Sequence, residues 1–271
     1  MISIRHGVAH APGRVSRGVI LGVIGTVFLI PFVAMVEFTL RKGLGGGYDF
    51  SRWIALFSGG LTGEYRPVLT ALGNSVSLAI GTVTIMLALL VPTMILVQLR
   101  FPRLRRVLEI ICVLPISIPA IVLVVGLAPV YSVVARLFGS GVWTLAFAYG
   151  ITVLPYAYRA IQSNLDAVDV RTLSEAARTL GAGPVSILWS VLLPNLKRGV
   201  LAASFISVAV VLGEFTIASL LNRINLQTAL VVVSKNDPYT AVILSLLALT
   251  FAFVLLIVIG RIGASRKKDT P

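Results

Sequence analysis

Few residues in this chain have the types and spacing that chemistry requires. His6 and His10 have the i, i+4 spacing of a metal-binding pair, but they lie in a stretch containing Gly and Pro with no third ligand nearby. Cys112 is the single cysteine, so an internal disulfide is excluded, and we expect a small apolar core residue there. The sequence therefore predicts no metal site and no catalytic residue.

Motifs that bind nucleotide phosphates or organise catalysis are missing. The chain has no G-x-x-x-x-G-K-[ST] loop, no G-x-S-x-G and no H-E-x-x-H. It also lacks clusters of histidine and carboxylate at spacings suited to acid–base chemistry. We expect that the chain is not an enzyme and holds no cofactor. If its work uses ATP and Mg²⁺, a partner subunit binds them.

Glu214 is the acidic residue that lies deepest in an apolar run. A carboxylate is costly in lipid and faces the protein interior or water, so such an acid is a candidate for a transport pathway and would suit a cationic solute. The alternative is that Glu214 pairs with a basic group on a neighbouring helix. Polar side chains also join helices to each other, so four further pathway candidates are weaker: Asn74, Ser77, Ser204 and Ser207.

The composition is that of a membrane protein. Hydrophobic residues make up 57% of the 271 residues and charged residues 12%, and the mean hydropathy is +0.98. A bilayer core needs roughly 20 apolar residues of helix. Runs of that length predict an all-α integral membrane protein with six spans, at 19–40, 67–99, 107–135, 142–162, 199–222 and 238–260.

The net charge of +13 does not point to nucleic acid, because the basic residues are unevenly placed. With the amino terminus inside, 16 of the 23 Lys and Arg residues fall in segments on the inner side. Retention of basic loops in the cytoplasm explains this asymmetry, so we expect both termini to be cytoplasmic in a bacterial inner membrane. The first span resembles a signal sequence, but it is too long for one and no A-x-A site follows it, so we expect an uncleaved anchor.

These spans divide the chain into five parts. We expect a cytoplasmic basic tail (1–18), a first membrane helix (19–40), an external loop (41–68), a five-helix core (69–260) that includes an inner loop (163–198), and a second cytoplasmic basic tail (261–271). In the outer segment before the last span, Leu226, Leu230 and Val233 are expected to form a short apolar face that closes a pathway or meets a partner.

The inner loop holds a compact module unlike the apolar runs around it. Thr172 and Glu175 fit a capping box, which predicts a helix from near Leu173. One helical face then carries Leu173, Ala176, Ala177 and Leu180.

Two glycines and a proline follow this helix. Gly181 and Gly183 are typical of a left-handed helix stop, and Pro184 of the first residue of the next helix. That second helix, at 185–193, is expected to lie along the inner membrane surface and to end at Pro194. On pattern alone the module is equally an ordinary cytoplasmic loop.

The spacing of the module carries a resemblance. Glu175-Ala176-Ala177, Gly181, Val191 and Leu193-Pro194 resemble the EAA loop of the membrane subunits of binding-protein-dependent ABC importers, with Val191 where that family usually has Ile. The resemblance extends to Asn74-Ser75, the basic turn at 100–106, the break at 114–119 and the stretch 212–215.

The resemblance implies a type I permease fold with a cytoplasmic coupling helix that seats in a cleft of a separate ATPase. It implies a second permease subunit, identical or homologous, two ATP-binding cassette subunits and an extracytoplasmic solute-binding protein. Glu175 either pairs with a basic residue of the ATPase or only caps its helix. The coupling residues it implies are Glu175, Ala176, Ala177, Leu180, Gly181, Leu193 and Pro194.

The solute is less well specified. The stretch 177–182 resembles importers of polyamines, aminoethylphosphonate, thiamine, iron or oxyanions, and the whole chain is most similar to the spermidine/putrescine type. A channel or secondary transporter would need an inverted repeat or more buried charges, and a membrane enzyme would need convergent catalytic groups. Neither pattern is found in the sequence.

Overall fold

The computed structural model describes residues 13–43, 46–60 and 65–265. Within these residues the regular secondary structure is helical, apart from an isolated β-bridge between Arg41 and Tyr48. The all-α class predicted from the sequence is confirmed for this part of the chain. The α-helices are α1 (Arg14–Leu40), α2 (Ser51–Ala55), α3 (Arg66–Arg100), α4 (Arg105–Val113), α5 (Ala120–Phe138), α6 (Ala146–Ala167), α7 (Val170–Thr179), α8 (Pro184–Ser186), α9 (Leu193–Gly213), α10 (Thr216–Leu220), α11 (Leu226–Asn236) and α12 (Pro238–Ser265).

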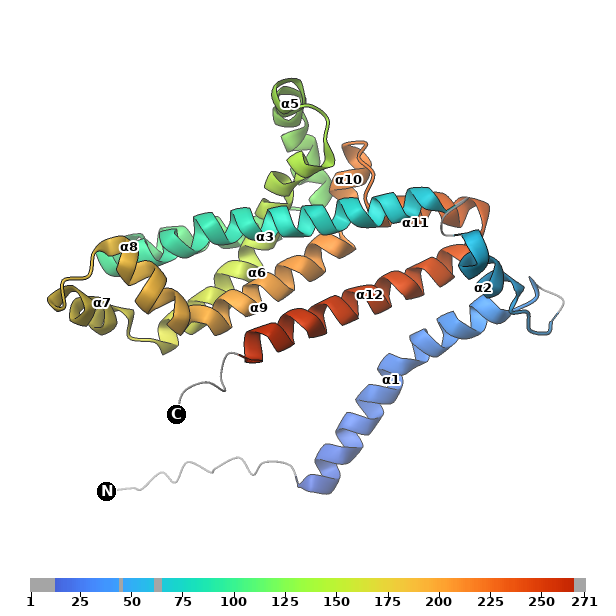
Figure 1. Cartoon of the computed structure of the whole chain (residues 1–271), viewed down its shortest axis with the longest axis horizontal. Helices are drawn as coiled ribbons and strands as arrows, with labels where there is room; N and C mark the ends of the chain where they lie inside the picture. The colour runs from blue at the N-terminus through green and yellow to red at the C-terminus, as the bar shows by residue number, and fades with distance from the viewer. Residues whose placement is uncertain (1–12, 44–45, 61–64, 266–271) are drawn as a thin grey trace.

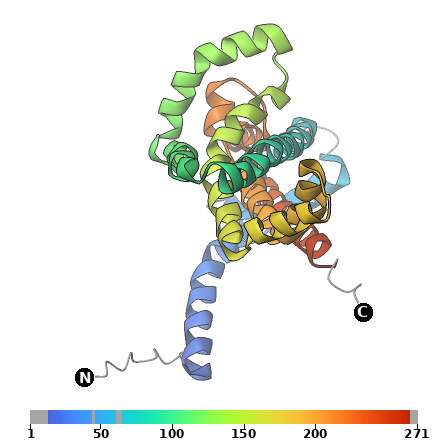
Figure 2. The ribbon, with the colours of Figure 1, turned by 90° about the vertical axis from the view of Figure 1, so that its left-hand side faces the viewer.

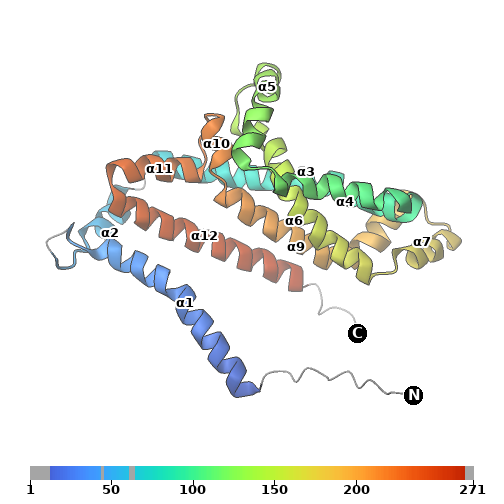
Figure 3. The same cartoon turned by 180° about the vertical axis from the view of Figure 1, so that it is seen from behind.

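Helices α3, α6 and α9 form the core and run side by side along the long axis of the molecule (Figures 1 and 3). Each of the three contacts the other two. Their shared interior is apolar and fully buried, with Leu78 from α3, Tyr149 and Val153 from α6, and Leu196 from α9. The lone Cys112 is also buried, on α4, as expected of a small core residue.

The predicted span 107–135 is not one helix. Helix α4 ends at Val113, a short 3₁₀ turn covers Leu114–Ser117, and α5 begins only at Ala120. Pro115 and Pro119 lack amide hydrogens and therefore interrupt the hydrogen-bond ladder between the two helices. As a result α5 arches away from α3, α6 and α9 (Figure 2).

The hydroxyl of Tyr131 ties α5 to the start of α6. It accepts a hydrogen bond from the amide of Ala148 at 2.9 Å and donates one to the carbonyl of Thr144 at 2.9 Å. The arch of α5 is therefore anchored to the core at this point.

Helix α1 is the first predicted span and begins at Arg14, five residues before the expected start. It diverges from the rest of the molecule, and its C-terminal end meets α12 (Figure 1). There the rings of Phe38 and Tyr239 stack at 4.8 Å, and Trp53 donates a hydrogen bond to the hydroxyl of Thr39. The apolar side chains along most of α1 are exposed, so its burial requires lipid or another chain.

Five helices of the described residues are long and apolar enough to cross a membrane: α1, α3, α5, the continuous helix Pro184–Gly213 and α12. The predicted spans 67–99 and 238–260 correspond to α3 and α12. The predicted span 199–222 ends early, at Gly213, because the helix stops there. Helix α6 corresponds to 142–162 but carries more polar residues, so the count of six spans stays a prediction, as does the side on which the termini lie.

Gly199 marks the closest approach of α9 to α6. A Cβ at this position would lie 2.6 Å from the Cβ of Asn164 and 3.1 Å from the carbonyl oxygen of Ala160. We expect Gly199→Ala to destabilise the fold by about 1–3 kcal/mol, because the two helices must separate. Thermal unfolding of the purified protein in detergent measures this.

Gly150 on α6 is the matched control, because a Cβ there meets nothing within 4 Å. Gly150→Ala should leave the unfolding temperature unchanged or raise it slightly, since alanine is the better helix former. Equal unfolding temperatures for Gly199→Ala and wild type would contradict the close approach.

Candidate functional site

The hairpin formed by α7 and α8 contains the module identified in the sequence. Helix α7 begins at Val170, and its N-cap is Asp169, not Thr172 as predicted. The Asp169 carboxylate accepts hydrogen bonds from the amide of Thr172 at 3.1 Å and from its hydroxyl at 2.7 Å. These bonds hold the pKa of the Asp169 carboxyl below its ordinary value, so the cap is lost only when the pH falls through that lowered pKa.

Glu175 does not cap α7, because the helix has already run for more than a turn before it. Its carboxylate instead lies 3.6 Å from Arg171 one turn earlier, and both side chains are largely exposed. Such a surface pair contributes little to stability. Of the two roles expected for Glu175, capping is wrong, and pairing with a partner stays a prediction.

The two alanines of the module face in different directions. Ala177 is 9% exposed and packs inward with Val170 and Ser174, whereas Ala176 and Leu180 point outward. The predicted face of Leu173, Ala176, Ala177 and Leu180 is therefore half right: Leu173 and Ala177 pack inward, whereas Ala176 and Leu180 do not. The inward face begins three residues earlier, at Val170. Leu180 is 88% exposed, which is exceptional for leucine and leaves it free to contact another molecule.

The turn after α7 follows the prediction at one glycine and not at the other. Gly181 has φ 84°, in the left-handed region, and the Ala182 amide donates to the Ala177 carbonyl at 3.0 Å to close the helix. Gly183 is extended instead, with φ −74° and ψ 164°. Pro184 is the first residue of α8, as predicted.

Pro194 does not end the second helix of the hairpin. Helical hydrogen bonding continues from Pro184 through a π-helical stretch, Ile187–Leu192, into α9. A proline removes one amide donor, and a π-helical stretch just before it is a common way to absorb such a defect. The direction of the helix changes between α8 and α9 (Figure 1), so Leu193 and Pro194 lie where the hairpin joins the core.

Glu214 lies directly after α9 and not within a membrane helix. Its backbone is extended, and its carboxylate accepts hydrogen bonds from the amides of Ile217 at 2.8 Å and Ala218 at 3.4 Å. The carboxylate thus satisfies free amides of α10. Among the described residues no basic side chain pairs with it, so the expected ion pair is replaced by backbone contacts, and the pathway role stays a prediction.

Asn225 is the centre of a buried hydrogen-bond network that links the core helices at this end. It is fully buried, and its Nδ2 donates to the carbonyl of Glu214 at 2.6 Å and to the hydroxyl of Tyr149 at 3.2 Å. Its Oδ1 accepts from the amide of Thr228 at 2.9 Å, which starts α11 with a capping box. The segment between α10 and α11 is therefore tied to α9 and α6.

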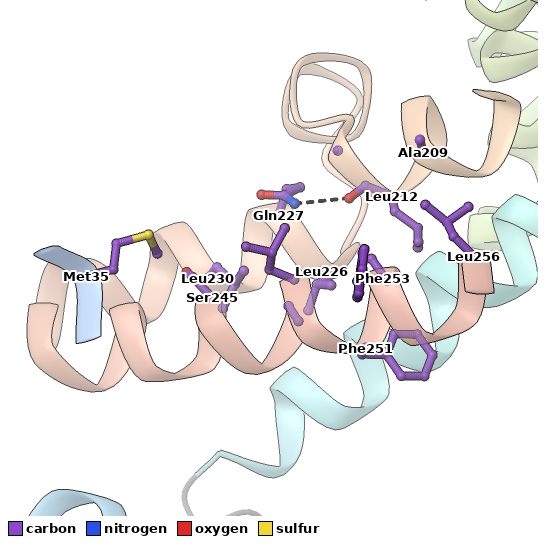
Figure 4. A pocket seen from close by; sticks show the side chains of 14 residues that line it. Met35, Ala209, Leu212, Leu226, Gln227, Leu230, Ser245, Phe251, Phe253 and Leu256 are labelled. Carbon is purple, nitrogen blue, oxygen red and sulfur yellow. Dashed lines mark hydrogen bonds between the residues drawn. The ribbon is translucent and has the colours of Figure 1, made fainter. Parts of the chain in front are cut away.

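Two contacts from α3 and one to α9 complete the network. Ser75 accepts from the amide of Leu226 at 2.8 Å, and Asn74 donates to the carbonyl of Ile224 at 2.9 Å. Gln227 donates to the carbonyl of Leu212 at 3.0 Å (Figure 4). Asn74 therefore belongs to this hydrogen-bond network. The other weak pathway candidates each donate to a carbonyl four residues earlier in their own helices: Ser77, Ser204 and Ser207.

Sequence reasoning did not single out Asn225 or Tyr149. The pair Asn225 and Thr228 before an apolar run is a helix-start signal that could have placed α11. The hydrogen bond between Asn225 and Tyr149 joins residues 76 positions apart and has no local signal. The predicted apolar face of α11 is used within the chain, because Leu226 and Leu230 are buried and border an apolar groove of about 450 Å³ between α9, α11 and α12 (Figure 4).

Residues 85–265 match the family model described as "Binding-protein-dependent transport system inner membrane component". The chain belongs to this family. The matched region holds the C-terminal part of α3 and all helices from α4 to α12, so it includes the hairpin and Asn225 with its partners outside α3. The family that the sequence suggested is thereby confirmed, and the chain is a multi-pass permease of the inner membrane. The role of the loop motif stays a prediction.

Individual relatives agree on the class but differ in solute. The chain is 27% identical to the spermidine/putrescine transport system permease protein PotC of Haemophilus influenzae over 216 residues, 77% of this chain and 79% of that protein. It is 33% identical to the molybdenum transport system permease protein ModB of Escherichia coli (strain K12) over 132 residues, 45% of this chain and 57% of ModB. A probable ABC transporter permease protein, y4fN of Sinorhizobium fredii, is 27% identical over 88% of this chain but only 43% of its own length.

The His6–His10 pair and the ends of both tails, 1–12 and 266–271, lie outside the described residues, as do 44–45 and 61–64 of the predicted external loop.

The contacts of Glu214 predict how Glu214→Gln behaves. An amide has one acceptor oxygen and no charge, so the bonds to the α10 amides weaken, and a hydrogen bond to a charged group contributes about 1.5–3 kcal/mol. We expect a lower unfolding temperature in detergent with an unchanged KM for uptake. Glu37→Gln is the control, because Glu37 pairs with Arg41 on an exposed surface and its loss should change neither quantity. A raised KM at an unchanged unfolding temperature would instead assign Glu214 to the pathway.

Proposed function

We propose that the chain is the permease subunit of an ATP-driven importer and that the α7–α8 hairpin couples it to a separate ATPase. The observation that carries this is the outward surface of the hairpin. Leu180 and Trp189 are 88% and 66% exposed, so two large apolar side chains stand free at one end of the molecule. Exposed apolar surface of this kind marks a contact with another molecule, and it lies on the loop that resembles the EAA loop.

In this proposal the membrane is crossed six times, with both termini in the cytoplasm. Helix α6 is the sixth span. It is less apolar than the others, with Arg159, Gln162 and Asn164 in its second half, but it is packed against both α3 and α9 and so presents little of its surface to lipid. The basic inner loops support the orientation.

The assembly we propose has two permease subunits, two ATP-binding cassette subunits and an extracytoplasmic solute-binding protein. ATP and Mg²⁺ are bound by the ATPase, because the chain has no phosphate-binding loop. The permease itself is therefore not an enzyme. The exposed apolar faces of α1 and α5 are the surfaces available to lipid and to the second permease.

The solute we propose is a small polar molecule, and a polyamine such as spermidine or putrescine is the first choice. The support is the alignment with PotC, which covers most of both chains. An oxyanion is the second choice, because the higher identity, over a shorter stretch, is to ModB. Glu214 does not support a cationic solute, because its carboxylate accepts hydrogen bonds from backbone amides. Binding measurements on the cognate solute-binding protein decide between the two.

Leu180→Glu tests the coupling surface. Because Leu180 makes little contact within the chain, the variant should insert and unfold like wild type but lose the ATPase subunit when the complex is purified in mild detergent. Leu180→Met keeps an apolar side chain of similar volume and should retain the ATPase. Wild-type recovery of the ATPase with Leu180→Glu would exclude the α7–α8 hairpin as the docking site.

Gly181→Val tests the angle between the two helices of the hairpin. A Cβ at Gly181 meets no atom within 4 Å, but φ 84° is strained for a β-branched residue, so the substitution acts through the backbone. We expect normal insertion and loss of uptake by more than tenfold, measured with radiolabelled solute. Ala177→Trp is a poor test of the same surface, because Ala177 faces the core.

A further inference from the structure

A cleft of about 360 Å³ lies between the last turns of α3 and the α7–α8 hairpin, at the left end of the molecule in Figure 1. Two arginines line it, Arg100 from the last turn of α3 and Arg178 from the last turn of α7. The remaining lining is largely apolar and comes from both elements: Pro92, Ile95, Leu96, Leu99, Val185 and Leu188. The cleft thus combines positive charge with an apolar wall.

The two arginines have no acidic partner among the described residues. No carboxylate lines the cleft, and the acids of the hairpin and its approach are engaged elsewhere. Asp166 binds Arg105 at 2.8 Å, Asp169 caps α7 through Thr172, and Glu175 lies beside Arg171. Two like charges in one cleft repel each other, and a bound anion would relieve that repulsion.

Arg178 is not needed to complete its own helix. Two carbonyls at the end of α7 already have partners, because the amide of Gly181 donates to the carbonyl of Arg178 at 2.9 Å and that of Ala182 to Ala177. The guanidinium is exposed, and it is free to bind a ligand in the cleft.

The position of the cleft selects the class of anion. Arg100 is the last residue of the long apolar helix α3, where a membrane span meets the head-group region of the bilayer. Ile95, Leu96 and Leu99 precede Arg100 on α3, so the apolar wall runs back along a helix that is long and apolar enough to cross a membrane. An occupant must therefore present an anionic group to the arginines and an apolar chain to the wall, which is the structure of an anionic phospholipid.

We propose that this cleft binds one anionic phospholipid, whose phosphate is held by Arg100 and Arg178 and whose acyl chain lies along the apolar wall. The proposal rests on the proposed function for its orientation, since it places the hairpin at the cytoplasmic face. A lipid bound there connects the coupling hairpin to α3, so transport by the assembled importer depends on anionic lipid.

Lipid retention measured by native mass spectrometry tests the site directly. The full chain is purified from detergent containing equal amounts of phosphatidylglycerol and phosphatidylcholine, and retained lipid is counted. Wild type should retain more phosphatidylglycerol than phosphatidylcholine. The double variant Arg100→Gln/Arg178→Gln should lose this preference by about 30-fold, the loss expected for two basic residues at their usual strength against anionic lipid.

Two further variants make the result specific. Arg103→Gln/Arg106→Gln removes two exposed arginines from the adjoining turn that do not line the cleft, and it should retain phosphatidylglycerol like wild type. Arg100→Lys/Arg178→Lys keeps the charge without the planar donor pair, and it should bind with intermediate strength.

Equal loss of phosphatidylglycerol in the two glutamine double variants would overturn the proposal, because bulk charge would then explain retention. Unchanged retention in Arg100→Gln/Arg178→Gln together with loss of the ATPase subunit would also overturn it and would assign the arginines to an acidic surface of the ATPase. Lipid retention is read on the chain alone, so a failure of the coupling function shows separately, as absence of the ATPase from wild-type preparations.

Discussion

The structure depends on one constraint, that every polar backbone group exposed by a broken helix in a membrane protein must find a partner within the protein. An unpaired amide or carbonyl in hydrocarbon costs several kcal/mol. The chain breaks its helical path on both sides of α10, after Gly213 and before Leu226, and the Asn225 network satisfies several of the backbone groups that these breaks expose. The same hydrogen bonds fasten α9 to α6 and α11 to α3. The repair of these breaks thus fixes the relative positions of the core helices.

The opposite end of the core is organised differently. The α7–α8 hairpin has one face that packs inward through Val170, Ser174 and Ala177, and another that leaves Leu180 free. A left-handed turn at Gly181 and a continuous helical connection into α9 join the hairpin to the core. The hairpin is therefore linked through α9 to the Asn225 network at the far end of that helix.

Apolar surface that the chain does not bury defines its surroundings. Helices α1 and α5 leave the three-helix core and expose most of their apolar side chains. Only a bilayer or another apolar chain stabilises such surfaces. Between the two ends of the core, the chain is thus built for contacts with lipid and with further subunits. In the proposed lipid site, Arg100 and Arg178 add contacts with lipid head groups to these apolar contacts.

The sequence by itself determined the features that depend on composition and on single residues. Hydropathy over about 20 residues placed α3 and α12, because burial in lipid depends on the length and polarity of one helix. Gly181 and Pro184 were placed correctly because their backbone preferences are local. The long spacing of the loop motif gave the family, which the match over 85–265 confirmed.

Tertiary structure decided the questions that local patterns leave open. Asp169 and Thr172 are both good caps, three residues apart, and the burial of Val170 favours the earlier start. The packing of Val170 and Ser174 against the core then turned Ala177 inward and Ala176 outward. The partner of Glu214 and the bond between Asn225 and Tyr149 were likewise set by packing, because they depend on which helix ends meet in space, and distant pairs leave no periodic trace in the sequence.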